Sequence, residues 1–293
     1  MRKRTTFWII AIVVVPVLLV TMYFFLLNNR PGKPGPLPER IKGELRIGTL
    51  NVCWMAFNKD ASVTADVIAA SAQQNDLDIL LLQEYKPHWN FDEKAFRAVL
   101  RGRYKYVSIE DECVCISRYP LKSHKRVRFE DMSDNFSDIV VSLPGGKEVE
   151  IFCVHLITTG INNFMSEDIP LDVAEIGAAG TFLGNSAIRK NQAVSLAHRV
   201  EKVARELIVA GDFNCVPGMA PYRQMLSASL KDSFLSAGKG KGSTYRGFGD
   251  LFRIDYIFYG PGLECLDSRV VDDGTSDHKM VVGSFVFAEE EVE

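Results

Sequence analysis

The chain has 293 residues, of which 47% are hydrophobic, and its formal net charge is −3. No shift in composition follows residue 40, so one α/β domain of about 250 residues is expected rather than two domains. Four of the 34 basic residues and none of the 37 acidic ones precede residue 31, which leaves a net charge of about −7 on the rest. This negative balance argues against bulk, nonspecific adhesion to nucleic acid, although it does not exclude a nuclease with a carboxylate-rich metal site.

The N-terminal segment differs in composition from the rest of the chain. Residues 1–6 carry three basic side chains, and residues 7–27 form a 21-residue run without any charge. Because about 20 apolar residues in a helix cross a bilayer core, this run is predicted to be a transmembrane anchor. The positive-inside rule then makes residues 1–6 a cytoplasmic tail and places the rest of this single-pass membrane protein outside the cytoplasm. A long, cleaved signal peptide is the alternative, although no small-residue cleavage site ends the run.

The segment after this run is a candidate linker. Residues 28–40 contain four prolines and two glycines, a composition typical of a stiff, extended spacer or of a disordered tether. We therefore expect the folded domain to span residues 41–288, with residues 289–293 as an acidic tail.

Apolar runs predict the strands of this domain. The run at 77–84 is almost wholly apolar, which is typical of a strand buried on both faces. The Pro-Gly-Gly sequence at 144–146 indicates a hairpin turn. In chain order, the predicted strands are residues 45–51, 77–84, 104–117, 139–143, 149–156, 207–210, 254–259 and 280–287.

Three helices are predicted between these strands. Residues 64–74 and 221–227 are short, whereas residues 186–207 carry a long apolar stripe that Ser186 can cap. Residues 157–184 lack periodicity and are expected to be a long loop, of the kind that is usually functional or mobile. Helices interleaved with hairpin-like strand pairs indicate α/β layers with substantial antiparallel sheet.

Polar residues whose side chains can bind a metal or take part in catalysis stand at the ends of six apolar runs. Alone, each has an ordinary explanation: a glutamate that begins a solvated loop, an Asx turn, a structural histidine or a helix cap. Together, and in this order, they indicate side chains that converge at one rim of a sheet. The residues are Asn51, Glu84, His155, Asp212, Asn214, Asp255, Asp277 and His278.

This set suits phosphoester hydrolysis. The reaction requires neutralised phosphate oxygens, an activated water and a stabilised leaving oxygen. Mg²⁺ prefers one or two carboxylates together with waters and substrate oxygens, so Glu84 is the best candidate ligand. Asn51 adjoins it as a neutral oxygen donor or phosphate contact. The six cysteines lack the paired spacing of a zinc site, and the sequence leaves their disulfide state open.

A family resemblance rests on the combination of Gly211-Asp-Phe-Asn214, Arg253-Ile-Asp-Tyr-Ile257 and Ser276-Asp-His278. Over residues 45–287 the chain resembles the endonuclease/exonuclease/phosphatase superfamily, which includes deoxyribonucleases, apurinic-site endonucleases, inositol-polyphosphate phosphatases and neutral sphingomyelinases. Residues 116–121, and Arg189 with Gln192, agree with that resemblance. It implies a four-layer α/β sandwich with two mixed sheets packed face to face, and a hydrolase that depends on Mg²⁺ or Mn²⁺, with one or two ions.

The resemblance also implies residue roles. Asp212 orients or deprotonates the attacking water, and Asn214 holds that water or the phosphate. His278 contacts the scissile phosphate, while Asp255 binds its other ring nitrogen. The remaining implied roles are a general acid for His155, a metal ligand or metal-shell residue for Asp277, and substrate contacts for Arg189 and Tyr245, although residues 244–246 can equally be an ordinary exposed loop.

Three functions compete at this point. His155 favours a nuclease or nuclease-like phosphodiesterase. The predicted anchor favours an enzyme acting on phospholipid or inositol-phosphate head groups, although no lipid-inserting aromatic stripe is evident. An inactive binding module has no reason to keep a full carboxylate cluster. Substrate selection is expected near residues 112–115 and 157–184, where the sequence departs from the family pattern.

Overall fold

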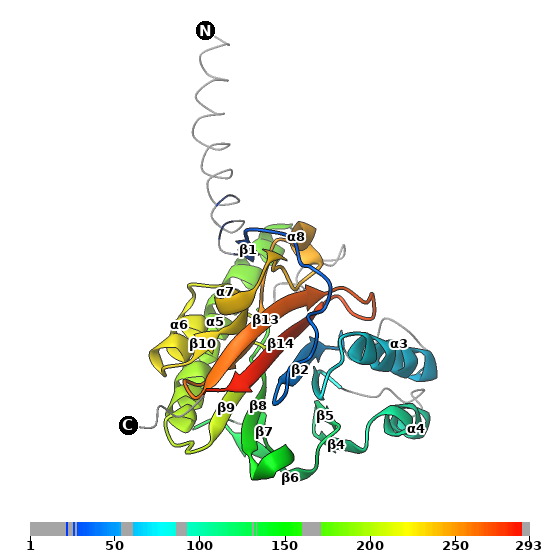
Figure 1. The fold of residues 1–293 in the computed structure, drawn as a ribbon. Coiled ribbons are helices and arrows are strands. Elements are labelled where there is room, and N and C mark those ends of the chain that lie inside the picture. Colours follow the sequence, from blue (N-terminus) through cyan, green and yellow to red (C-terminus); the bar gives the residue numbers. More distant parts are fainter. Residues whose placement is uncertain are drawn as a thin grey trace.

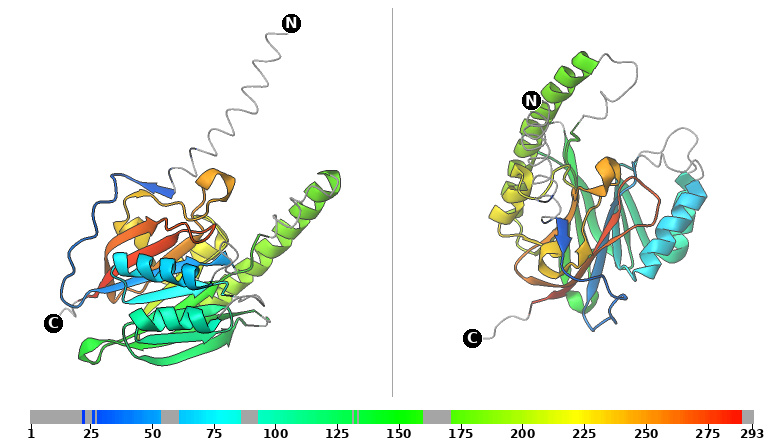
Figure 2. Two further views of the ribbon diagram at one scale, coloured as in Figure 1. Left: turned by 90° about the vertical axis from the view of Figure 1, so that its right-hand side faces the viewer. Right: turned by 90° about the horizontal axis from the view of Figure 1, so that it is seen from above.

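The computed structural model describes residues 28–53, 61–85, 93–130, 132, 134–159 and 171–288, together with Met22 and Leu26. Two six-stranded mixed sheets lie face to face, and helices cover their outer faces (Figure 1). Seen from above, helices α3 and α4 lie on one side of the strands, and α5 and α6 lie on the other (Figure 2). This arrangement confirms the predicted α/β fold with two mixed sheets.

The first sheet has the strand order β13-β14-β2-β3-β5-β4. Strands β2 and β3 are parallel, and the other neighbours are antiparallel. All five residues of β3 are buried, as expected for a strand covered on both faces. The bounds are β2 Leu45–Asn51, β3 Ile79–Gln83, β4 Tyr106–Glu110, β5 Cys113–Ser117, β13 Leu263–Val271 and β14 Met280–Phe287.

The second sheet has the order β10-β12-β9-β8-β7-β6, with β8 and β9 parallel. Strand β6 forms one edge of this sheet and is rich in basic residues. The 3-10 turn η3 (Pro144–Gly146) joins β7 to β8 at the predicted hairpin. The bounds are β6 Leu121–Arg128, β7 Asn135–Ser142, β8 Glu148–His155, β9 Glu206–Asp212, β10 Lys231–Asp232 and β12 Asp255–Tyr259.

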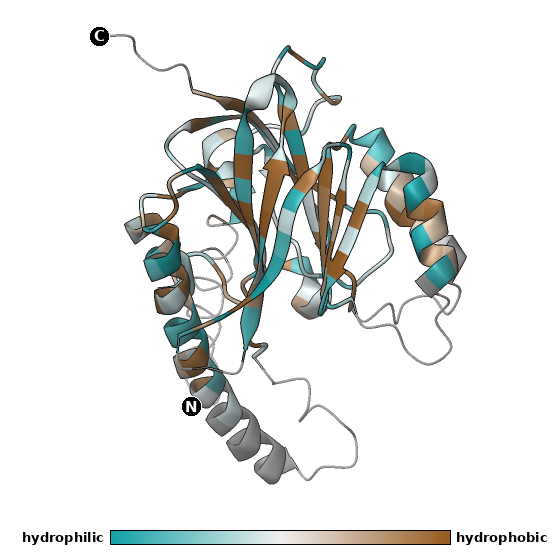
Figure 3. Cartoon of the chain, turned by 90° about the horizontal axis from the view of Figure 1, so that it is seen from below, coloured by the Kyte–Doolittle hydropathy of each residue, from teal (hydrophilic) through white to brown (hydrophobic). Residues whose placement is uncertain are grey.

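Three apolar clusters hold the layers together. Ile47, Ile151 and Ile257 belong to the cluster between the two sheets. A second cluster packs the first sheet against α3 and α4, and a third packs the second sheet against α5 and α6. In Figure 3 the strands carry much of the hydrophobic colour, whereas the outer helices alternate between hydrophobic and hydrophilic residues. The helices are α3 Ala61–Gln74, α4 Glu93–Arg103, α5 Leu171–Val200, α6 Ala220–Ser227, α7 Ser233–Ala237 and α8 Gly247–Asp250.

Strand register brings the ends of several strands to one rim. Asn51 pairs with Gln83, the residue before Glu84, across the parallel β2–β3 pair. In the second sheet Asp212 pairs with His155 on one side and with Asp255 on the other. Because β8 and β9 are parallel, their carboxyl ends meet at the same edge. The predicted convergence of these side chains therefore follows directly from strand pairing.

Several predicted elements differ from the observed ones. Helix α5 begins at Leu171, inside the predicted loop at 157–184, so Ser186 lies within the helix and does not cap it. The helix ends at Val200 instead of residue 207, because i→i+3 turns follow it and the apolar stripe continues into strand β9. A turn at Asp111, with a φ of 54°, divides the predicted strand 104–117 into β4 and β5.

The N-terminal region is described only in part. Apart from Met22 and Leu26, the predicted anchor at 7–27 lies outside the described residues, as do the tails at 1–6 and 289–293. Among the residues that are described, no helix is both long and apolar enough to span a membrane.

The Pro/Gly-rich segment at 28–40 packs along the domain. Strand β1 (Asn29–Arg30) pairs with β11 (Gly240–Lys241), and Arg46 donates a 2.8 Å hydrogen bond to the carbonyl of Pro38. Arg40 forms ion pairs of 2.7 and 2.8 Å with Asp76 and Asp78. This segment follows the protein surface and does not stand away from it as the predicted spacer would.

Gly211 is a sensitive position because β8 and β9 approach closely there. Its φ is 142°, and an added Cβ would lie 1.9 Å from the carbonyl oxygen of Val154. We expect Gly211→Ala to lower the free energy of unfolding by about 3 kcal/mol or more, from backbone strain and overpacking. Denaturant unfolding measures this loss. Gly102→Ala, in helix α4 with nothing within 4 Å of the new Cβ, is the control and should keep wild-type stability or gain about 0.5–1 kcal/mol.

A buried ion pair offers a second test of the fold. Nη1 of Arg253 lies 2.8 Å from Oδ2 of Asp232, and neither side chain is more than 2% exposed. We expect Asp232→Ala to cost about 3–5 kcal/mol, because it leaves a buried guanidinium unpaired. Asp66→Ala, which removes the exposed 3.1 Å pair with Arg103, should leave the melting temperature unchanged. Similar melting temperatures for both variants would contradict this account.

Candidate active site

The amide of Asn51 lies at the centre of the polar cluster. Its Nδ2 donates a 3.0 Å hydrogen bond to Oε1 of Glu84 and another of 3.0 Å to Oδ2 of Asp212. Its Oδ1 accepts a 2.9 Å hydrogen bond from the backbone N–H of Cys53. Asn51 and Asp212 are each 1% exposed. One side chain therefore holds two carboxylates together at the rim where the sheets meet.

His155 lies beside both of these carboxylates. Its Nε2 is 3.1 Å from Oε1 of Glu84 and 4.0 Å from Oδ2 of Asp212. The 3.1 Å contact is an ion pair when His155 is protonated. Burial alone would lower the pKa of His155, but the charges of Glu84 and Asp212 outweigh it and raise that pKa. The pKa of Glu84 is lowered, because His155 and Asn51 outweigh the opposing effect of burial.

His278 forms the second imidazole–carboxylate pair. Its Nδ1 lies 2.9 Å from Oδ2 of Asp255, and its Nε2 lies 3.9 Å from Oδ2 of Asp212. Burial opposes the charged imidazolium, but the carboxylates of Asp255 and Asp212 outweigh it and raise the pKa of His278 to about 10. With Nδ1 bound to Asp255, Nε2 is the ring nitrogen that faces the site.

Asp212 and Asn214 form one local unit. The backbone N–H of Asn214 donates a 2.7 Å hydrogen bond to Oδ1 of Asp212, which is the Asx-type bond that the sequence allows. The side-chain Nδ2 of Asn214 donates a hydrogen bond of 3.1 Å to Oδ2 of Asp212 and another of 2.9 Å to the carbonyl of Leu156. Burial, and then the charge of Asp255, raise the pKa of Asp212 to about 6. The Asx-type turn at residues 212–214 thus fixes the position of the Asp212 carboxylate in the site.

Asp277 is half-buried and lies close to Cys53. Ser276 donates a 3.2 Å hydrogen bond from its hydroxyl to Oδ1 of Asp277. Burial, followed by the charges of Asp277 and Glu84, raises the pKa of the Cys53 thiol to about 12. Both carboxylates therefore lie near this thiol. Cys53 was not among the predicted site residues, because a single cysteine after a strand carries no distinguishing signal.

The donor atoms fit a hard divalent cation. Glu84, His155 and Asp212 each offer an atom within 4.8 Å of the others, and so do Asp212, Asp255 and His278. The carboxylates in these groups, those of Glu84, Asp212 and Asp255, are oxygen ligands of the type that Mg²⁺ prefers, and Asp277 belongs to neither group. Asn51 directs its amide nitrogen at Glu84, because its oxygen is bound to Cys53. Asn51 thus fits better as a residue that positions Glu84 than as an oxygen ligand.

Arg189 and Gln192 of helix α5 hold the backbone that follows His155. Nη1 of Arg189 donates a 2.7 Å hydrogen bond to the carbonyl of Ile157. Oε1 of Gln192 accepts a 2.9 Å hydrogen bond from the N–H of Ile157. Gln192 also donates 2.9 Å to Asp134. Arg189 is fully buried, so it has no surface with which to touch a substrate. Its Nε and Nη2 have no hydrogen-bond partner among the described residues.

Tyr245, a predicted substrate contact, lies beside His278. It is half-buried, and its ring centroid is 5.2 Å from that of His278. An isolated β-bridge joins the backbones of the two residues. Tyr245 therefore forms a wall of the site beside His278.

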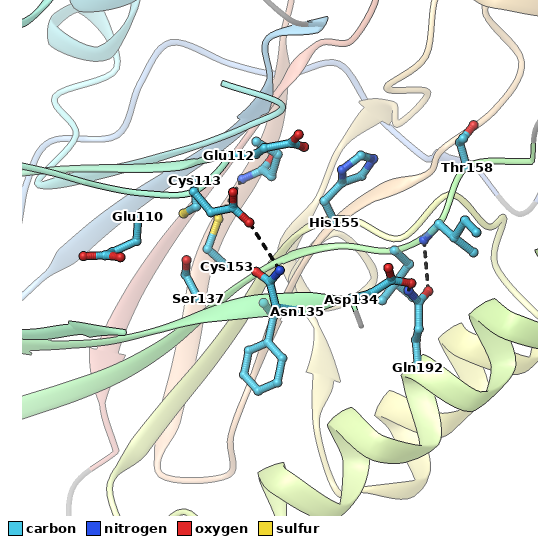
Figure 4. A pocket seen from close by; sticks show the side chains of 15 residues that line it. Glu110, Glu112, Cys113, Asp134, Asn135, Ser137, Cys153, His155, Thr158 and Gln192 are labelled. Carbon is cyan, nitrogen blue, oxygen red and sulfur yellow. Dashed lines mark hydrogen bonds between the residues drawn. The ribbon is translucent and has the colours of Figure 1, made fainter. Parts of the chain in front are cut away.

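A pocket of about 340 Å³ adjoins the site at His155 (Figure 4). It is bounded by the β4–β5 turn, the start of β7 and the end of β8. Four carboxylates line it, namely those of Glu110, Asp111, Glu112 and Asp134. Part of this lining, at residues 112–113, lies in the segment where substrate selection is expected. The pocket is therefore an acidic extension of the site.

The comparisons with known proteins identify the family. Residues 48–278 match the Endonuclease/Exonuclease/phosphatase family, so the chain belongs to that family of phosphoesterases and nucleases. No curated protein sequence matches significantly.

Solved structures of low sequence identity share the fold. An endonuclease/exonuclease/phosphatase from Beutenbergia cavernae is 19% identical, with a TM-score of 0.61, over 86% of this chain and 74% of that one. Truncated Caenorhabditis elegans TDP2 is 16% identical, with a TM-score of 0.56, over 84% and 98%. Sphingomyelinase C from Streptomyces griseocarneus is 17% identical, with a TM-score of 0.54, over 84% and 99%.

Metal binding at this rim is directly measurable. We expect Mg²⁺ or Mn²⁺ to stabilise the folded chain, by about 2.7 kcal/mol at a concentration 100 times the dissociation constant. Glu84→Gln should remove most of that stabilisation, because it removes a charged oxygen ligand. The matched control is Glu264→Gln, an exposed position on β13. Thermal unfolding with increasing metal provides the measurement, and an equal response of Glu84→Gln and wild type would refute the site.

Proposed function

We propose that this chain is a divalent-metal-dependent phosphodiester hydrolase, anchored in a membrane by residues 7–27 with its catalytic domain outside the cytoplasm. The observation that carries the reaction class is the placement of Asp212. Its carboxylate faces Nε2 of His155 at 4.0 Å and Nε2 of His278 at 3.9 Å, while Asn51 joins it to Glu84. The family match supports the same class of reaction.

Each residue of the site has a separate role in hydrolysis. Asp212 accepts the proton of the attacking water, a role that suits a buried carboxylate held by two amide side chains. His278 donates a hydrogen bond from Nε2 to a phosphate oxygen, with Asp255 keeping its ring in place through Nδ1. His155 supplies a proton to the leaving oxygen. A divalent cation bound by Glu84 and Asp277 would neutralise charge on the phosphate oxygens.

Two substrate classes fit this chemistry. Nucleic acid is favoured by His155, which matches the histidine of deoxyribonuclease-like members of the family. The phosphodiesters or phosphates of lipid head groups are favoured by the apolar run at 7–27. The four carboxylates of the pocket beside His155 argue against a long polyanion in that pocket. An inactive binding module would require neither of the two imidazole–carboxylate pairs, His155–Glu84 and His278–Asp255.

Activity on a soluble diester tests this proposal. Purified full-length protein should hydrolyse bis(p-nitrophenyl) phosphate in the presence of Mg²⁺ or Mn²⁺, and a chelator should abolish the reaction. His278→Ala and Asp212→Asn should each lower the rate by about 10²-fold or more, the scale expected for lost acid–base groups. His198→Ala, an exposed histidine paired with Glu130, is the control and should retain the rate. Wild-type rates in both site variants would exclude this mechanism.

A further inference from the structure

One loop connects the end of the N-terminal segment to the catalytic rim. The carbonyl of Asn28 accepts a 2.8 Å hydrogen bond from the N–H of Gly242, and Nδ2 of Asn28 donates 2.5 Å to the carbonyl of Leu251. Asn28 is only 1% exposed. Strand β1 then pairs with β11, and β1 and α8 lie side by side in Figures 1 and 2. The uncharged run that ends at Leu27 is therefore followed at once by residues bound to the domain.

The same loop is bonded to the segment that carries His278. The N–H of Lys279 donates a 2.7 Å hydrogen bond to the carbonyl of Thr244. The N–H of Arg246 donates a 2.8 Å hydrogen bond to the carbonyl of Asp277. Tyr245 lies between these two bonds and against the His278 ring. Three residues of chain span at most about 10 Å, so Gly242, which holds Asn28, lies within about that distance of Tyr245.

Phe248 is the exposed tip of this loop. It is 52% exposed, and its ring centroid lies 5.7 Å from that of Phe252. The φ angles of Phe248, Gly249 and Asp250 are 52°, 72° and 60°. A positive φ is costly for a bulky residue and persists only where the surroundings impose it. Here Asp250 is held by Lys279 and Lys241, at 2.6 Å each, so the loop is braced while a large aromatic side chain faces outward.

We propose that the face made by residues 28–30, 239–241 and 247–249, here called the joint face, lies against the lipid bilayer, and that the substrate is a phospholipid whose head-group phosphodiester enters beside Tyr245. This inference rests on the proposed function. The occupant is assigned from the chain itself, because a run of 21 uncharged residues ends one position before Asn28. Phe248 suits the apolar boundary of a bilayer, and Arg30 and Lys239 suit anionic lipid phosphates.

The fixed geometry favours lipid over nucleic acid. A free spacer would let the site turn in any direction, but the bonds at Asn28 keep the loop of Tyr245 at the point where the anchor ends. A nucleic acid would have to reach a site that lies at the bilayer surface. A lipid head group already lies at the bilayer surface, next to the site. In the reaction, the water oxygen bonds to phosphorus, one P–O ester bond breaks, and the leaving oxygen takes a proton, giving an alcohol and a phosphomonoester.

Bilayer contact is tested first, without reference to catalysis. Full-length Phe248→Trp is reconstituted in vesicles of phosphatidylcholine and phosphatidylglycerol, with and without brominated acyl chains. We expect the added tryptophan fluorescence, measured relative to the wild type, to be quenched by the brominated lipid. Leu226→Trp is the matched control, since Leu226 is 40% exposed on α6, and its added fluorescence should not be quenched. Equal quenching of the two variants, or none in Phe248→Trp, would overturn the proposed face.

Substrate class is tested in the same vesicles. Wild-type protein should release phosphomonoester or diacylglycerol from the vesicle lipid and also hydrolyse soluble bis(p-nitrophenyl) phosphate. Phe248→Asp should lower lipid turnover by about tenfold or more by removing the apolar contact, and keep the soluble rate. An aspartate tolerates the positive φ at this position. Leu226→Asp should keep both rates.

The possible failures are distinguishable. Hydrolysis of the soluble diester and of plasmid DNA without any lipid turnover would overturn the lipid inference and leave the proposed function standing. Unchanged lipid turnover in Phe248→Asp would overturn the role of the joint face. Absence of diester hydrolysis in the wild type would refute the proposed function itself, whereas the quenching experiment would still decide whether the joint face contacts the bilayer.

Discussion

The side-chain amide of Asn51 joins the two sheets at the point where the chemistry is placed. Asn51 and Glu84 stand at the ends of strands of the first sheet, and Asp212 ends a strand of the second. Burying a carboxylate is costly unless its oxygens have partners, so a donor between the two sheets favours their close packing at this point. Asn51 supplies that donor to both sides, and its own oxygen is satisfied by the backbone at Cys53.

Strained backbone gathers around this junction. Of the eight non-glycine residues with positive φ in the described part of the chain, Cys53, Glu84 and Asn214 belong to the site, and Phe248 and Asp250 belong to the loop beside it. Such conformations cost about 1–3 kcal/mol each and survive only where surrounding contacts over-determine them. The hydrogen bonds of Asn51, Asp212 and Lys279 are contacts of this kind. Fixing the directions of the side chains at this rim therefore lowers the stability of the fold.

The sequence predicted the strands at the centre of each sheet and the polar residues at their ends. These features depend on apolar runs and on residue order, which are local. Strand β6 was missed because its residues are mostly polar and exposed, so it has no apolar alternation to detect. The end of α5 was misplaced because the apolar residues that follow the helix, up to Leu207, serve burial in a strand as well as in a helix.

The interior contacts of the site lay beyond sequence reasoning for a different reason. The role of Gln192 in binding Ile157, and that of Asp232 in neutralising Arg253, are pairings between residues far apart in the chain. A lone cysteine or glutamine has many ordinary environments, and only the packed structure selects one. Arg189 shows the same limit, since the family resemblance implied a substrate contact, whereas the side chain is buried and bound to the carbonyl of Ile157.

Strand β6 has a consequence for behaviour in a crowded environment. An unpaired sheet edge is a template on which another chain can add a strand, and so a starting point for aggregation. Strand β6 carries four basic side chains within eight residues, Lys122, Lys125, Arg126 and Arg128, of which Lys122 is paired with Glu148 and Arg126 with Asp111. A second copy aligned along this edge would bring two such rows together, and their repulsion opposes that pairing. The polarity that hid the strand from prediction therefore also disfavours strand addition at this edge.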